Sequence, residues 1–429
     1  MNSIILTNEN YCATIIRIHQ LIDLDDLDNL KGVSQYGFQA LVNKDYSIDD
    51  LYVLFTAECQ LDETYCKENN LFDKPELNKD PNKKGYINSK RRVRTVKLRG
   101  HISSALLMPI SSLSYLCDVT KLKEGDMFNI IDNVELCKKY VIKHSNTESK
   151  KKASTSKLKY RALSNTKSFP EHFDTMHWLR NEHKIDDDQE IIVTAKLHGS
   201  SFRACHQQVM EYKSWAIPFL TRLYKAGYGN WKIIKFIAKF LRKNVWRVIA
   251  GSRRVVKMEG YSNTHYYDSD IWNQKLSEIG HLIPKNWVIY GELIGWAGDK
   301  PIQKGYTYDV PNGKCHLYVY RISIVNEDGI SVDLSQDQMA KWCLENGLKT
   351  CPELWRGPKH AFKYEQFMDT NYVKDGFTQA VPLSKDSPCD EGVVIRIEGG
   401  LTPEHFKCKA PLFLGHETKV LDTDESLIE

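Results

Sequence analysis

Residues 191–201 read Ile191-Ile192-Val193-Thr194-Ala195-Lys196-Leu197-His198-Gly199-Ser200-Ser201, an apolar run followed by a lysine and a short polar segment. The apolar run predicts a strand, and Gly199 permits a tight turn directly after it. A lysine is a poor nucleophile at neutral pH because its ordinary pKa is about 10.4, but burial and neighbouring cations lower that value. Lys196 is therefore a candidate nucleophile. The pattern is not specific by itself, since Lys97-Leu98-Arg99-Gly100 repeats it.

Charged and aromatic side chains follow this segment on a succession of predicted apolar strands. In chain order they are Arg253 and Arg254 after Gly251, Glu292 at the end of 287–291, Tyr318 and Tyr320 in an aromatic strand, Glu391 before 392–396, and Lys407 with Lys409. The last two are spaced by two residues and so share one face of a strand. Carboxylates and cations gathered in this way suit a nucleoside triphosphate, and no such succession follows Lys97.

The ordered set resembles the covalent nucleotidyltransferase superfamily of ATP-dependent ligases and mRNA capping enzymes, over roughly residues 165–415. Lys-Leu-His-Gly followed by hydroxyl residues is similar to RNA ligases, since DNA ligases favour Asp at the position of His198. The front half of the chain resembles that of the family-five RNA ligases, in which an OB domain precedes the ligase domain.

The resemblance implies roles for individual residues. Lys196 is expected to attack the α-phosphate of ATP and form a lysyl-AMP intermediate, with Glu391, Lys407 and Lys409 as the other catalytic residues. The expected ATP/AMP-binding residues are Lys196, His198, Gly199, Arg253, Glu292, Tyr320, Glu391, Lys407 and Lys409. Arg254 is the alternative to Arg253, and Tyr318 is the alternative to Tyr320 for stacking on adenine. Glu391 is the expected ligand of a divalent metal, Mg²⁺ or Mn²⁺, directly or through water.

These residues predict an ATP-dependent RNA ligase that adenylylates itself, transfers AMP to a 5′-phosphate end and seals that end to a 3′-hydroxyl. The resemblance suggests breaks held in duplex RNA or RNA-containing nicks as substrates. An mRNA capping guanylyltransferase is the main alternative, although its OB domain would follow the last lysine pair, and few residues follow Lys409. A non-catalytic nucleic-acid-binding protein that retains a ligase-like fold is a second alternative.

The composition favours a soluble intracellular protein. The net charge of +4 is mild, so the distribution of charge matters more than its sum. The 11 cysteines contain no Cys-x-x-Cys pair, which is typical of reduced thiols rather than of a disulfide scaffold or a zinc site. There is no signal-peptide pattern and no long apolar run. We expect a cytoplasmic monomer that binds ATP and RNA or an RNA-containing nicked duplex, with no membrane partner.

The fold class expected is α+β, with an N-terminal OB-fold β-barrel over residues 1–140, a flexible polar linker over 141–164, and an adenylyltransferase domain over 165–429. Short strands predicted at 12–18, 38–42, 51–55, 93–98 and 104–109 support the barrel. The ligase domain is expected to have antiparallel sheets with flanking helices, similar to an ATP-grasp-like ligase fold. Residues 90–100 carry six basic side chains, which suit either a solvated edge strand or a face that follows phosphates.

A basic and aromatic segment interrupts the ligase domain at about 211–248 and predicts a helical insertion. Residues 213–247 contain nine Lys or Arg and no Asp or Glu. One helical stripe is apolar and contains Ile233, Ile237, Phe240 and Leu241. Another side is basic and contains Lys232, Lys235, Lys239 and Lys243. Three interpretations remain open: packing on its own domain, a nucleic-acid clamp, and a membrane-surface helix.

Overall fold

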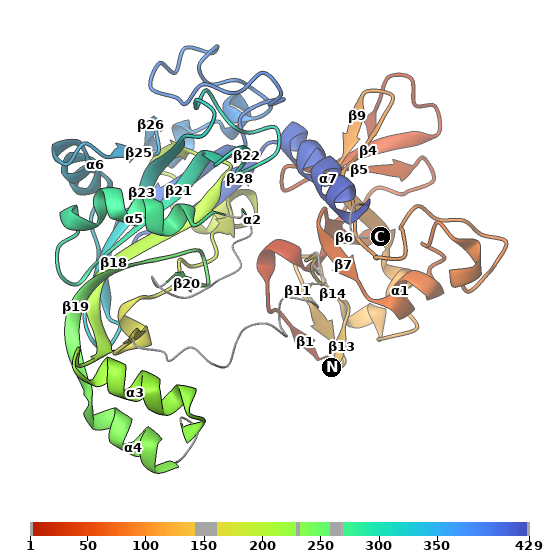
Figure 1. The fold of residues 1–429 in the computed structure, drawn as a ribbon. Helices are drawn as coiled ribbons and strands as arrows, with labels where there is room; N and C mark the ends of the chain where they lie inside the picture. Colours follow the sequence, from red (N-terminus) through yellow and green to blue (C-terminus); the bar gives the residue numbers. More distant parts are fainter. Residues whose placement is uncertain (1–2, 142–160, 229–231, 258–266, 268, 427–429) are drawn as a thin grey trace.

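The computed structural model describes residues 3–141, 161–228, 232–257, 267 and 269–426. It is an α+β protein built from mostly antiparallel sheets. In Figure 1 the N-terminal strands, in red and orange, lie to the right and the two large sheets lie to the left. The C-terminal helix α7 (Pro411–Ser426) returns to the N-terminal strands and lies beside them.

Residues 3–139 form small antiparallel sheets around their own apolar core. The largest has the strand order β10-β6-β2-β11. The strands are β1 (Ile4–Ile5), β2 (Ala13–Arg17), β3 (Ile22–Asp23), β4 (Leu30–Gln35), β5 (Phe38–Asn43), β6 (Leu51–Thr56), β7 (Cys59–Leu61), β8 (Val96–Leu98), β9 (His101–Ser103), β10 (Ala105–Pro109), β11 (Met127–Phe128), β12 (Ile130–Ile131), β13 (Val134–Glu135) and β14 (Cys137–Lys139). Four of the five predicted strands are present with each end within one residue of the prediction, and the fifth, predicted at 93–98, begins only at Val96. Their assembly as an OB barrel stays a prediction.

Two larger sheets form the rest of the described fold. One contains β20-β19-β18-β21-β23-β24, with β15, β22 and β25 paired to its members, and the other runs β16-β28-β27-β17-β26. Their strands are β15 (Arg161–Leu163), β16 (Met176–His177), β17 (Glu190–Ala195), β18 (Ser200–Tyr212), β19 (Arg242–Gly251), β20 (Val256–Lys257), β21 (Trp287–Ala297), β22 (Lys300–Pro301), β23 (Cys315–Val325), β24 (Ser331–Asp333), β25 (Lys349–Thr350), β26 (Glu353–Pro358), β27 (Gly392–Ile397) and β28 (Glu404–Lys409). The other helices are α1 (Glu63–Glu68), α2 (Trp178–Asn181), α3 (Ala216–Lys225), α4 (Lys232–Phe240), α5 (Ile271–Ile279) and α6 (Gln336–Glu345).

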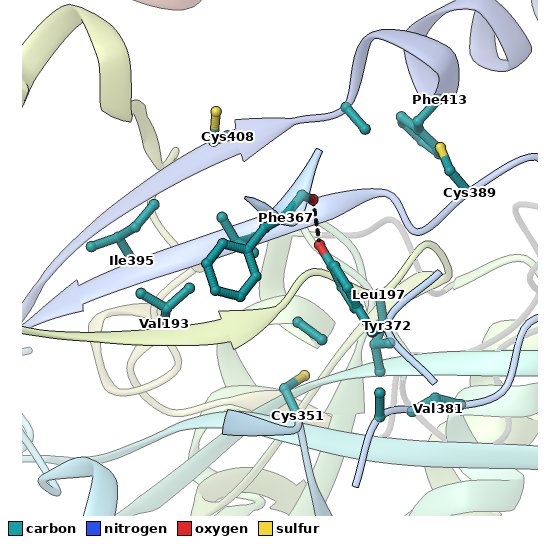
Figure 2. Packing of buried hydrophobic residues seen from close by; sticks show 14 of the residues in the cluster. Val193, Leu197, Cys351, Phe367, Tyr372, Val381, Cys389, Ile395, Cys408 and Phe413 are labelled. Carbon is teal, nitrogen blue, oxygen red and sulfur yellow. Dashed lines mark hydrogen bonds between the residues drawn. The ribbon is translucent and has the colours of Figure 1, made fainter. Parts of the chain in front are cut away.

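An apolar core joins these two sheets and fixes the segment that carries Lys196 (Figure 2). Val193 of β17 and Ile395 of β27 are fully buried in it, and the two strands pair antiparallel. Leu197, directly after the lysine, is 4% exposed and belongs to the same core. Burial of the residues on both sides of Lys196 therefore holds its backbone in place.

The basic segment 90–100 joins the N-terminal strands to α7. The Arg92 side chain is fully buried, and its Nη2 donates to Asp422 Oδ1 at 2.8 Å and to the Thr418 carbonyl at 3.2 Å. Thr418 Oγ1 in turn donates to Glu58 Oε1 at 3.1 Å. Neither sequence interpretation of this segment is right for Arg92, because it forms a buried contact across the molecule rather than facing solvent or phosphate.

The helical insertion is narrower than predicted. β18 extends through Tyr212 and β19 begins at Arg242, so the helices α3 and α4 occupy only the part between them. They form a hairpin that projects from the end of these two strands (Figure 1). Ala216, Leu220 and Ala238 pack together between the helices.

Residues 142–160, most of the predicted linker, lie outside the described residues. The end of the predicted linker, which ran to residue 164, belongs to a sheet instead, because Arg161–Leu163 form β15 and pair with β18. The ion pair between Arg161 Nε and Glu211 Oε1, at 2.7 Å, holds this short strand to the sheet. None of the described helices has the length and apolar content needed to cross a bilayer.

Candidate active site

Lys196 lies directly after β17 and points into a cavity. Its backbone N–H donates to the Gly392 carbonyl at 2.9 Å, which continues the pairing of β17 with β27. Its Nζ donates to Glu391 Oε1 at 2.7 Å. The predicted nucleophile is therefore held by a carboxylate directly before the neighbouring strand β27 and does not extend into bulk solvent.

The turn after Lys196 requires a glycine. A Cβ on Gly199 would lie 2.2 Å from the Leu293 carbonyl oxygen, so no larger residue fits against β21. The Gly199 N–H donates to Glu292 Oε1 at 3.1 Å, and the His198 N–H donates to the Tyr308 hydroxyl at 2.6 Å. The first bond connects the turn to β21, and the second connects it to Tyr308, which lies outside the strands. Burial lowers the pKa of the His198 side chain to about 4.

Glu391 is buried at the centre of the candidate site. Burial by itself would raise the pKa of this carboxyl, but Lys196, Lys409 and His198 hold it below its ordinary value. Lys409 Nζ lies 3.5 Å from Glu391 Oε1, the oxygen that also accepts from Lys196. Glu391 is thus a carboxylate shared between two ammonium groups.

The two lysines of β28 differ in their surroundings. Burial, together with the nearby cations Lys409 and Lys196, lowers the pKa of Lys407 to about 7. Burial also acts to lower the pKa of Lys409, but the Glu417 and Glu391 carboxylates raise it above its ordinary value. Lys409 Nζ donates to both oxygens of Glu417, on α7, at 3.1 Å.

Glu292 differs from its predicted setting. The sequence suggested that the strand ends here, whereas β21 continues to Ala297 because the residues after Glu292 pair with β23. Burial raises the pKa of the Glu292 carboxyl to about 8, and the Lys196 ammonium partly opposes this shift. The side chain lines the cavity that holds Lys196.

The remaining predicted residues lie on the same cavity wall or close to it. Arg253 follows β19, lines the cavity and forms an ion pair with Asp174. Tyr320 of β23 lines the cavity, whereas Tyr318 lines a different one. Of the two tyrosines, only Tyr320 is therefore near Lys196.

The cavity has a volume of about 450 Å³ and brings all nine predicted ATP/AMP-binding residues together. Sequence reasoning missed several of its lining residues: Tyr11, Lys139, His172, Phe173, His405 and Glu417. Tyr11 ends a short 3-10 helix, Glu9–Tyr11, and Lys139 ends β14, so both halves of the molecule contribute to the cavity. Their sequence neighbourhoods carry no motif, because only the fold brings them beside β28.

The donor set suits a cation that keeps much of its water. Within the described residues there is no cluster of three or more His, Cys, Asp or Glu that could hold a metal. Glu391 Oε2, however, is buried and has no hydrogen-bond partner there. One free carboxylate oxygen fits Mg²⁺ or Mn²⁺ with several water ligands, and it does not form a closed protein cage.

Comparisons with known proteins identify the family and the fold of this chain. The RNA ligase family model matches residues 189–410. A search of curated proteins found no match. Solved structures of an RNA ligase from Naegleria gruberi are similar in fold. A lysine-to-methionine variant with AMP and Mn has a TM-score of 0.56 and 15% identity, covering 94% of this chain and 98% of that one. The same ligase with PPi has a TM-score of 0.56 and 15% identity, with coverage of 96% and 100%. A lysine-to-alanine variant with ATP and Mn has a TM-score of 0.55 and 14% identity, covering 96% of this chain and 99% of that one.

Proposed function

The chain belongs to the RNA ligase family, and on that premise we propose that it is an ATP-dependent ligase that joins RNA ends through an adenylate carried on Lys196. One observation carries the proposal. The Lys196 Nζ is held by Glu391 at 2.7 Å, inside a cavity lined by Arg253, Lys407 and Lys409. A nucleophile surrounded by cations suits attack on a triphosphate, whose developing charge those cations would stabilise.

In the first step the Lys196 Nζ transfers a proton to solvent water, and its freed lone pair forms a bond to the α-phosphorus of ATP. The bond from that phosphorus to the bridging oxygen breaks, and pyrophosphate leaves. Glu391 orients the amine, and Lys407 and Lys409 hold the phosphate oxygens while the phosphorus is five-coordinate. The lowered pKa of Lys407 supports this role, because crowded cations favour an incoming polyanion.

The other residues bind the nucleoside. Glu292 accepts from a ribose hydroxyl, and Tyr320 stacks on adenine, a contact worth about 1–3 kcal/mol. Arg253 holds the ribose or the 3′ end of the outgoing strand. His198 and Gly199 shape the turn next to the nucleotide.

Glu391 is also the residue that would hold Mg²⁺ or Mn²⁺, through its free Oε2 or through water. When bound, such a cation supplies positive charge at the α-phosphate oxygens. The presence of Mn in the Naegleria gruberi ligase with AMP or ATP supports this assignment.

In the second step AMP passes from Lys196 to a 5′-phosphate end, and in the third a 3′-hydroxyl attacks that end and releases AMP. We propose breaks in duplex RNA or RNA-containing nicks as the substrate, with the N-terminal strands acting as an OB module that binds the nucleic acid. All 11 cysteines are free thiols, which supports an intracellular, reducing compartment.

Incubation of the protein with labelled ATP or labelled GTP tests the first step. We expect a covalent adduct with ATP that Lys196→Ala abolishes. Lys97→Ala is the matched control, because Lys97 occupies the second Lys-x-x-Gly copy on the exposed strand β8. An adduct formed only with GTP would instead identify a capping guanylyltransferase. Joining of nicked and single-stranded RNA and DNA ends then defines the substrate.

A further inference from the structure

Helices α3 and α4 form a basic hairpin far from the candidate active site. The hairpin connects β18 to β19, and β18 runs from Ser200 at the cavity to Tyr212 at the hairpin. At about 3.3 Å per residue this strand spans roughly 40 Å. Residues 213–247 have nine basic side chains and no acidic one. The proposed ligation chemistry makes no use of this hairpin.

Helix α4 has three distinct faces, given 3.6 residues per turn. Ala238 is buried against α3. A second face carries large apolar side chains that are between 42% and 68% exposed: Ile233, Phe236, Ile237 and Phe240. A third face carries Lys232, Lys235 and Lys239, all exposed. Trp215 and Phe219, at the start of the hairpin, are 66% and 52% exposed.

Packing on its own domain accounts for Ala216, Leu220 and Ala238, which cluster with Tyr212 of β18, but it leaves the largest apolar side chains of the hairpin facing solvent. An exposed apolar face of this kind is typical of a binding surface for an apolar partner. The uniformly basic charge of the hairpin favours a partner that is also anionic. A second copy of this chain brings the same positive charge. The proposed substrate, duplex RNA, supplies phosphates, but its bases are stacked on one another inside the helix, so it offers little apolar surface to Ile233 and Ile237. A bilayer containing anionic lipids satisfies both faces.

We propose that this hairpin docks on the surface of an anionic lipid bilayer. The Phe and Ile side chains enter the boundary between head groups and acyl chains, while the lysines remain at the lipid phosphates. This proposal departs from the expectation of no membrane partner, which stays a prediction. A helix that lies in the interface needs an exposed apolar face rather than a spanning segment.

Co-sedimentation of the full chain with vesicles tests the proposal. We expect binding to phosphatidylcholine vesicles that contain phosphatidylserine, weakened by salt, and little binding to phosphatidylcholine alone. Phe236→Ser/Phe240→Ser should reduce partitioning by about tenfold, because two exposed rings lose their apolar contact. Lys235→Glu/Lys239→Glu should reduce it similarly and flatten its salt dependence. Formation of the ATP adduct by each variant checks its folding.

The matched control is Ile330→Ser/Leu344→Ser, which removes two apolar side chains, 61% and 81% exposed, outside the hairpin. This variant should bind vesicles like the parent. Binding to duplex RNA separates the alternatives. If Phe236→Ser/Phe240→Ser keeps RNA affinity and loses vesicle binding, the proposal holds. It fails if no vesicle binding occurs, if that variant still binds vesicles, or if it loses only RNA affinity or self-association.

Discussion

Alternating charges connect Lys196 to the C-terminal helix. The Lys196 ammonium contacts the Glu391 carboxylate, Glu391 contacts Lys409 at 3.5 Å, and Lys409 contacts Glu417 at 3.1 Å. Each buried charge is thus opposed by a neighbour of opposite sign, which such burial requires. Lys407 differs, because burial and the surrounding cations lower its pKa to about 7.

A pH dependence of ATP binding should follow from Lys407. As the pH rises through about 7, its ammonium loses a proton and can no longer attract phosphate, so the KM for ATP in adenylylation should rise severalfold. Lys407→Arg keeps its charge over this range and should remove the rise. The rate of adduct formation, measured against ATP concentration at each pH, checks this. An equal rise in both proteins would show that another group is responsible.

At the scale of elements, the helix α7, which follows β28 in the chain, contacts two separate regions of the molecule. Its residue Glu417 binds Lys409 in the cavity, and its next residue, Thr418, bonds to Glu58 of the N-terminal half. One helix therefore contacts both the candidate site and the other half of the chain. The position of Lys409 depends on how α7 is docked.

Loss of the Glu417 carboxylate should affect both stability and chemistry. In Glu417→Ala, Glu391 is the one carboxylate within the described residues that still pairs with Lys409, and Glu391 also holds Lys196. We expect a loss of about 1–3 kcal/mol in unfolding free energy and slower adduct formation. Chemical denaturation and adduct kinetics measure the two effects. Glu404→Ala, which removes an exposed carboxylate from β28, is the control and should change neither.

The sequence allowed prediction of residues that sit on strands and missed those that depend on docking. Lys407 and Lys409 could be predicted as a pair because a strand places alternate residues on one face. Glu417 was not, because its partner lies eight positions away, across the end of β28, a spacing that no local rule identifies. Arg92 likewise pairs with Asp422, more than 300 positions later, so its basic neighbourhood suggested an exposed face.

At the scale of the whole molecule, buried polar contacts join the two halves. Arg180 of α2 donates to Thr14 Oγ1 of β2 at 2.7 Å, and Arg92 donates to Asp422 of α7 at 2.8 Å. Tyr11 lines the cavity together with residues of the two large sheets. The halves therefore contact each other through buried polar groups in this arrangement.

The contact between the halves should weaken at higher pH through Glu58. Burial raises the pKa of this carboxyl from 4.5 to about 7, with Arg92 opposing the shift. The folded chain keeps a proton that the unfolded chain loses, so this stabilisation is full below pH 4.5 and is lost as pH rises through about 7. Its size is about 3 kcal/mol. In Glu58→Gln the amide oxygen can still accept from Thr418, but the side chain does not titrate. The difference in thermal midpoint between this variant and the parent should therefore change with pH. A constant difference would contradict the prediction.

Lys139 tests whether the N-terminal half contributes to the nucleotide site. It ends β14, lines the cavity, and has its pKa lowered by burial and by the nearby cations Lys409 and Arg253. A cation placed there should attract the triphosphate, so Lys139→Ala should raise the KM for ATP severalfold with little change in thermal midpoint. Lys138→Ala is the matched control, because the adjacent Lys138 faces away and pairs with the exposed Glu135. Equal effects of the two substitutions would mean that net charge, rather than position in the cavity, governs ATP binding. An unchanged KM in Lys139→Ala would limit the N-terminal contribution to the fold and to the RNA.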